Sequence, residues 1–120
     1  MMKGRKNVSE YMSIRLDKTI KNEFYAFCQN CGMTVSFAVN LLVNKTVEEG
    51  KIPFEISSVN EPMGAYEGGE PQMLRASIRI DKEQREKFQK VCNSVGVPMS
   101  RLVKMYMLNC INSKKIPFGF

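Results

Sequence analysis

Apolar residues occupy alternate positions in two short stretches of the chain, from Met12 to Leu16 and from Leu74 to Ile80. A period of two is typical of a β-strand that buries one of its faces. Each stretch ends at an aspartate, Asp17 or Asp81, and aspartate favours the position just before the first turn of a helix. The pattern therefore predicts two strands, each followed directly by a helix.

After each aspartate the apolar spacing changes to that of an amphipathic helix. The residues that share one helical face are Ile20, Phe24, Phe27, Cys28 and Cys31 in the first stretch and Phe88, Val91, Cys92 and Val95 in the second. Gly32 and Gly96 then stand where the end of a helix favours a left-handed residue. Gln84 follows Asp81 by three residues, as in a capping box.

Second helices are expected over residues 35–49 and 99–113. Thr34 is a good cap for the first of them, and Pro98 suits the start of the second although it offers no capping oxygen. The two segments, VSFAVNLLVNKTV and MSRLVKMYMLNCI, are apolar on almost every side. A helix of this kind must be buried on several sides, which one strand and one other helix cannot achieve.

These two parts of the chain are copies of one another. A shift of 64 residues aligns 11–56 with 75–120 without a gap, and 14 of the 46 pairs are identical. Ordinary composition would give about three by chance. The identical positions, in the numbers of the first copy, are Ser13, Ile14, Arg15, Asp17, Lys18, Phe24, Cys28, Gly32, Ser36, Val39, Lys51, Ile52, Pro53 and Phe54.

A lone strand is not stable in water, so each strand needs a partner. We expect the two copies to pair within one chain, strand antiparallel to strand and second helix against second helix, with Ser13 opposite Ser77. The expected fold is mainly α, an intramolecular pseudo-dimer with a two-stranded antiparallel ribbon and four helices. The expected units are a basic arm at 1–10, a first repeat at 11–56, a linker rich in Gly, Pro and Glu at 57–73 and a second repeat at 74–120. The alternative is that two chains exchange copies and form a larger dimer.

Charge is unevenly spread along the chain. The net charge is +6, to which residues 1–56 contribute +2, residues 57–73 contribute −3 and residues 74–120 contribute +7. A second copy this basic favours a polyanionic partner, against the alternative of a solvated basic surface. No apolar run approaches the roughly 18 residues of a membrane span. The basic N-terminus leads into polar residues, so we expect a cytoplasmic protein without a membrane partner.

Chemistry other than binding finds little support in the sequence. Cys28 and Cys31 are spaced as C-x-x-C, but the chain has no histidine, and buried cysteines acting as small hydrophobic residues are the better interpretation. The nine methionines are expected mainly in the core, and an exposed remainder would let two pseudo-dimers associate. Catalytic motifs such as a nucleophile elbow or a phosphate-binding glycine loop are absent. We therefore expect no enzymatic activity, no metal site and no cofactor.

The polar face of the predicted ribbon points most directly to a function. Its residues are Tyr11, Ser13, Arg15, Arg75, Ser77 and Arg79. With Ser13 opposite Ser77, Arg15 faces Arg75, and like charges directly opposite on a sheet are unfavourable. An anionic ligand is the simplest reason to keep them, since arginine matches guanine edges and phosphate, and a two-stranded ribbon fits the major groove of DNA. The alternative is that exposed strand positions are polar for solubility alone.

The order strand–helix–helix with an SIRLDK-type strand resembles the ribbon-helix-helix DNA-binding proteins of the Arc and MetJ class. The first copy is most similar to the RelB/DinJ antitoxins. SIRLDKTIKNEF resembles that family's strand and first helix, and GMTVSFAVNLLVNKTVEEGKIPFEI resembles its turn, second helix and closing Gly-x-Ile-Pro-Phe-Glu. The resemblance covers residues 11–56 well and 75–120 more loosely.

The resemblance implies a role for each candidate residue. The family's outward strand residues read bases in the major groove, which assigns base contacts to Tyr11, Ser13, Arg15, Arg75, Ser77 and Arg79. The starts of its second helices hold phosphate on backbone amides, which assigns phosphate contacts to Thr34, Val35, Ser36, Pro98, Met99 and Ser100. Lys3, Arg5 and Lys6 in the basic arm would add phosphate contacts. Because the two strands differ, we expect a double-stranded DNA site that is an imperfect palindrome.

The expected function is that of a sequence-specific transcriptional repressor, or of the autoregulator of a toxin–antitoxin operon. Family members usually carry one copy and pair as dimers, whereas both halves here lie in one chain. Antitoxins of the family also carry a toxin-wrapping segment beyond the DNA-binding part, and the few residues after the second KIPF favour DNA binding over toxin neutralisation. The alternative is an antitoxin-like module that neutralises a toxin protein, with DNA binding secondary or lost.

Overall fold

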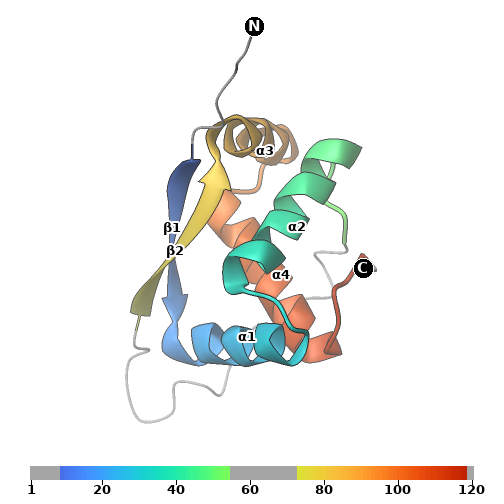
Figure 1. Ribbon diagram of the computed structural model, residues 1–120. Helices are drawn as coiled ribbons and strands as arrows, with labels where there is room; N and C mark the ends of the chain where they lie inside the picture. The colour runs from blue at the N-terminus through green and yellow to red at the C-terminus, as the bar shows by residue number, and fades with distance from the viewer. Residues whose placement is uncertain (1–8, 55–72, 119–120) are drawn as a thin grey trace, which may run out of the picture.

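The computed structural model describes residues 9–54 and 73–118. Along the chain these form β1 (Ser9–Asp17), α1 (Lys18–Asn30), α2 (Val35–Glu49), β2 (Met73–Asp81), α3 (Lys82–Val95) and α4 (Met99–Ser113) (Figure 1). The expected fold class is confirmed, since the described chain is mainly helical and consists of two β-α-α repeats. The bounds of α2 and α4 are those predicted from the sequence. Most of the predicted arm and linker lies outside the described residues.

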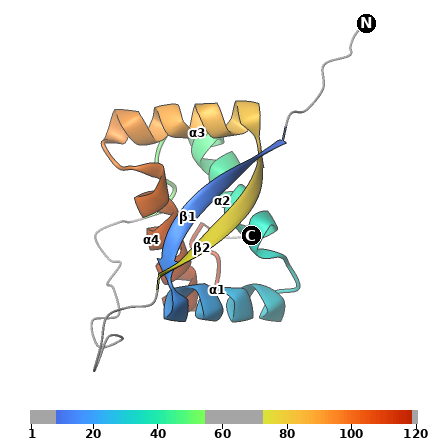
Figure 2. The ribbon, with the colours of Figure 1, turned by 90° about the vertical axis from the view of Figure 1, so that its left-hand side faces the viewer.

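The two strands belong to different repeats and pair antiparallel. Their register sets Ser13 opposite Ser77 and Arg15 opposite Arg75, as predicted. Ile14 and Ile78, on the other face of the ribbon, are 2% and 0% exposed. The ribbon lies across one side of the molecule, with α3 at one end, α1 at the other, and α2 and α4 behind it (Figure 2). Both strands come from one chain, so in this structure the copies pair within it.

The predicted starts of the helices are confirmed. The side chains of Asp17, Asp81 and Thr34 each accept a hydrogen bond from a backbone N–H of the following turn, at 3.0, 3.1 and 3.0 Å respectively. Pro98 begins α4 without a side-chain cap, as its chemistry requires. Gly96 ends α3 in the left-handed conformation with φ +76°, where a side chain would be strained.

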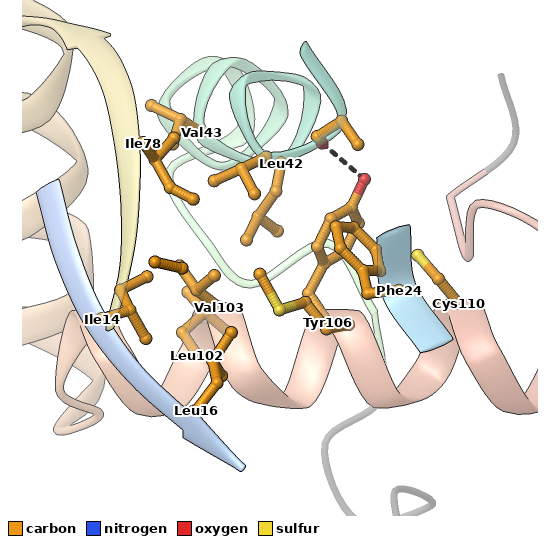
Figure 3. Close-up of a cluster of buried hydrophobic side chains, with 14 of the residues drawn as sticks. Ile14, Leu16, Phe24, Leu42, Val43, Ile78, Leu102, Val103, Tyr106 and Cys110 are labelled. Atoms are coloured by element: carbon orange, nitrogen blue, oxygen red, sulfur yellow. Dashed lines mark hydrogen bonds between the residues drawn. The ribbon is translucent and has the colours of Figure 1, made fainter. Parts of the chain in front are cut away.

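The repeats interlock around one core. The expected contact between the second helices is present, because the Tyr106 hydroxyl on α4 donates a 2.7 Å hydrogen bond to the carbonyl oxygen of Ala38 on α2 (Figure 3). In addition, α1 packs against α4 and α3 packs against α2, so each first helix covers the second helix of the other repeat. Leu42 on α2 and Leu102 on α4 are fully buried in this core. Neither repeat could keep this core without the other.

Polar contacts also join the two repeats. The Gln84 side-chain amide on α3 donates to the Asn44 side-chain oxygen on α2 at 2.9 Å. Arg85, also on α3, lies 3.7 Å from the Glu10 carboxylate on β1. Both pairs are partly exposed to solvent and therefore contribute little to stability. They help to orient α3 against its neighbours.

The apolar composition of the second helices follows from their burial. The buried residues are Ala38, Val39, Leu42, Val43 and Thr46 on α2, and Leu102, Val103, Tyr106, Met107, Leu108 and Cys110 on α4. Within the described ranges no single helix is long and apolar enough to cross a bilayer. Only α1 and α2 taken together reach that length and composition, and the chain bends by 89° between them.

Two residues assigned to the apolar helical faces are exposed, so that prediction was wrong for Cys31 and Val95. Cys31 follows the last residue of α1, and Gly32 then turns the chain with φ +73°. Val95 is the last residue of α3 and is 42% exposed. Both positions lie where the backbone leaves the helix, so the helical period no longer directs their side chains toward the core.

The other three cysteines confirm the interpretation as small buried hydrophobic residues. Cys28, Cys92 and Cys110 are free thiols with 1% or less of their surface exposed. Burial raises the pKa of the Cys28 and Cys92 thiols to about 11 and that of the Cys110 thiol to about 12. Among the described residues, no three His, Cys, Asp or Glu side chains are grouped so that they could hold a metal ion.

Replacement of Tyr106 by Phe tests the bond between the second helices. Because the hydroxyl is buried and its partner oxygen lies on the other repeat, Tyr106→Phe should lower the free energy of unfolding by about 1 kcal/mol. Urea denaturation measures the change. Tyr25→Phe is the matched control, since the Tyr25 hydroxyl is on the surface and its one hydrogen bond within the described ranges comes from Gln29 of its own helix. Equal effects of the two substitutions would contradict a structural role for the Tyr106 hydroxyl.

Thiol labelling tests the placement of the cysteines. The thiolate is the reactive form, so the buried thiols with raised pKa values should react slowly at pH 8 and Cys31 should react fast. Titration with an aromatic disulfide reagent is expected to show one fast thiol in the native protein and four after unfolding. Cys31→Ser should abolish the fast phase, and a fast thiol that remains in that variant would show that the core is open.

Candidate nucleic-acid interface

The ribbon brings the six predicted base-contacting residues onto one exposed face. They are Tyr11, Ser13 and Arg15 on β1 and Arg75, Ser77 and Arg79 on β2, and all are exposed. Side chains alternate between the two faces of a strand, and the residues between these six are buried or half-buried against the helices. The sequence predicted this arrangement because both strands keep the same period and register.

Positive charge is concentrated on this face. Arg15 and Arg75 are cross-strand neighbours, and Arg79 faces Tyr11, whose side chain is 67% exposed. Within the described residues none of the three arginines forms an ion pair. Two like charges held opposite each other on a ribbon weaken it slightly, by an amount on the order of a few tenths of a kcal/mol. The face is therefore complementary to an anion and poorly suited to stabilising the fold.

The start of α2 is hydrogen-bonded directly to the outer edge of β2. The Asn40 side-chain amide donates to the carbonyl oxygen of Arg79 at 2.9 Å and to that of Ser36 at 2.8 Å. The Ser36 hydroxyl accepts a longer bond, 3.4 Å, from the Arg79 backbone N–H. These contacts set the position of Arg79 relative to the start of α2. Sequence reasoning missed Asn40, although a lone amide within the apolar run VSFAVNLLV was a signal.

The predicted phosphate-contacting residues lie at two helix starts beside the strands. The first helical bond of α2 is donated by Ala38 to Thr34, and that of α4 by Leu102 to Pro98. The backbone N–H groups of Val35 and Ser36, and those of Met99 and Ser100, precede these bonds and so have no partner within their helices. Of these helices, α2 contacts β2 and α4 contacts β1. Each strand is thus in contact with the second helix of the opposite repeat, and hydrogen bonds to Arg79 fix the start of α2 beside β2.

The two helix starts are not equivalent. Thr34 uses its hydroxyl to bind the N–H of Phe37, whereas Pro98 leaves the first turn of α4 without a side-chain acceptor. Ser100, the counterpart of Ser36, makes no hydrogen bond to Arg15 within the described part of the chain. The predicted contacts of Lys3, Arg5 and Lys6 lie outside the described residues.

Comparison with known proteins gives one result that bears on this site. The model of the RelB antitoxin family matches residues 9–63 and again residues 73–120. No curated protein and no solved structure matches the chain. The two matched segments contain the two β-α-α repeats, each with its strand and both of its helices. The chain therefore belongs to the RelB antitoxin family and carries the family's unit twice.

Proposed function

We propose that this protein is a DNA-binding transcriptional repressor that reads the major groove with the outward face of its ribbon. The single observation that carries the proposal is the register of β1 and β2, which gathers three arginines and two serines on one exposed face, where none of the arginines has an ion-pair partner among the described residues. A two-stranded ribbon fits the major groove, where arginine can bind guanine through two hydrogen bonds and serine can bind several bases. Regulation of a toxin–antitoxin operon is the setting that the family suggests.

The order of residues across the ribbon supports an imperfectly symmetric DNA site. Ser13 and Ser77 lie at its centre, and Arg15 and Arg79 take equivalent places in the two repeats. The third position differs, since Tyr11 of the first repeat corresponds to Arg75 of the second. Two half-sites would therefore share their central bases and differ where tyrosine replaces arginine.

Phosphate contacts at the helix starts would hold the ribbon in the groove. Backbone N–H groups at a helix start attract anions, and those of Val35, Ser36, Met99 and Ser100 begin the two helices that contact the strands. Thr34 and Pro98 mark the starts of the same two helices. The bonds of Asn40 and Ser36 to the Arg79 backbone would hold the phosphate-binding start of α2 and the base-contacting Arg79 in a fixed relative position. Lys3, Arg5 and Lys6 are proposed to add contacts from the arm.

Binding to a fragment of the protein's own promoter tests the proposal. Fluorescence anisotropy at several salt concentrations should show tight binding to that fragment and weaker binding to unrelated DNA, with affinity falling steeply as salt rises. Weak binding that does not distinguish the two fragments would contradict the proposal, because the exposed arginines would then serve only as a solvated basic surface.

Substitution of the ribbon arginines should separate DNA binding from folding. Arg15→Ala or Arg79→Ala is expected to weaken specific binding by about 1–3 kcal/mol, the range for loss of one bidentate contact to a base. The free energy of unfolding should change by less than about 0.5 kcal/mol, since both side chains are exposed and form no ion pair in the described part of the chain. Lys51→Ala, which removes a charge after the end of α2, is the control for net charge. A loss of stability that matches the loss of affinity would count against the assignment.

A second function, binding and neutralisation of a toxin protein, is favoured by the family match. If a toxin gene adjoins the gene for this chain, co-expression of the chain should restore growth to cells that produce the toxin. The double variant Arg15→Ala, Arg79→Ala should protect equally well, because the ribbon face is assigned to DNA. Loss of protection in that variant would place the toxin on the ribbon and overturn the division of roles.

A further inference from the structure

A cavity opens beside the free edge of β2, between α1 and the start of α2. Its volume is about 400 Å³, within the range of about 300–1,000 Å³ that is usual for small-molecule sites. Val35 and the ring of Tyr25, which is 55% exposed, supply apolar walls, and the nearly buried Leu16, Phe24 and Met107 lie beneath them. This cavity lies at one end of the candidate DNA-binding face, since Arg75 and Ser77 also line it.

Comparison of the two repeats shows why there is space here. Ala76 lines the cavity, and the equivalent residue of the first repeat is Met12, whose side chain is buried with 5% exposed. Val35, at the start of α2, likewise corresponds to the larger Met99 at the start of α4. The second strand therefore carries a methyl group where the first fills the core with a methionine.

The charged residues at the cavity also differ from those at the corresponding position with the roles of the two repeats exchanged. Among the described residues, Lys21 and Arg75 line the cavity and no carboxylate does. The counterpart of Lys21 is Arg85, which lies 3.7 Å from Glu10. Within the described residues Lys21 has no such partner, because the residue equivalent to Glu10 is Leu74. Only this half thus keeps two cations beside an apolar space.

The edge of β2 adds hydrogen-bonding groups. The backbone N–H and C=O of Arg79 point away from β1, because they bind Ser36 and Asn40 of α2. In an antiparallel pair, residues two apart direct their backbone groups the same way. The backbone groups of Ser77 and Arg75 therefore also point away from β1, on the side where the cavity lies.

We propose that this cavity is a binding site for a small carboxylate with a flat apolar body. The body would pack against Val35 and the exposed ring of Tyr25, while Lys21 and Arg75 would hold the carboxylate. Apolar walls with a few convergent polar groups are typical of ligand sites. The cations select a negatively charged compound over a neutral one of the same shape.

Occupancy of the site would regulate DNA binding, a consequence that rests on the proposed function. The guanidinium of Arg75 cannot bind a carboxylate in the cavity and a base in the groove at once. A bound carboxylate would therefore remove one base contact from the half-site read by β2. The protein would release its promoter in response to the ligand.

Titration of the full chain with 2-naphthoate, in the absence of DNA, tests the site directly. Calorimetry should show saturable binding of one molecule per chain with a dissociation constant of about 1 mM or lower. Ala76→Met, which restores the side chain found at Met12, should abolish binding by filling the cavity. Lys21→Gln should weaken it about tenfold, and 2-naphthalenemethanol should bind more weakly than the carboxylate.

The control is Arg85→Gln, which alters the counterpart of Lys21 and should leave binding unchanged. The proposal is overturned if no saturable binding occurs, if Arg85→Gln weakens binding as much as Lys21→Gln does, or if inorganic phosphate competes as well as the carboxylate. The last result would identify a contact for the DNA backbone.

A separate measurement then adds 2-naphthoate to the promoter complex, where it should lower the affinity of the wild type for the promoter and leave that of Ala76→Met unchanged. If the protein does not bind DNA, only this measurement on the promoter complex fails. The binding of 2-naphthoate to the free protein would still stand.

Discussion

A single β-strand leaves its backbone N–H and C=O groups without partners, and every other feature of this molecule follows from how that problem is solved. The strand of one repeat pairs with the strand of the other, and the register is centred on Ser13 and Ser77. Once this register is set, one face of the ribbon must be apolar and covered by helices. The opposite face is then exposed along its whole length, so its residues are available for recognition.

The helices cover the ribbon only because the repeats interlock. Each first helix packs against the second helix of the other repeat, and Tyr106 binds Ala38 between the second helices. A repeat on its own would expose Leu42 or Leu102, which are fully buried here. Joining both copies in one chain makes this association independent of protein concentration. It also lets the two halves diverge, as they have at Tyr11 and Arg75 and at Met12 and Ala76.

The sequence predicted those features that depend on local chemistry or on the repeat. Helix starts at Asp17 and Thr34, the bounds of the second helices and the strand register follow from capping residues, periodicity and the duplication. The placement of Cys31 and Val95 was wrong because helical periodicity ends with the helix. Asn40 and the cavity beside Ala76 were not predicted, since both depend on how segments far apart in sequence meet. The DNA contacts themselves stay predictions, and those of the arm lie outside the described residues.

The whole arrangement requires Ser13 and Ser77 of one chain to face each other across a single ribbon. The double variant Ser13→Cys, Ser77→Cys, made in a Cys31→Ser background, tests it after mild oxidation. Facing residues that do not exchange ladder hydrogen bonds lie about 4.5 Å apart between Cα atoms, close enough for a disulfide. We expect a cross-link within one chain, seen as a monomer of increased mobility on a non-reducing gel. Covalent dimers would show that two chains exchange their repeats, and no cross-link at all would contradict the register.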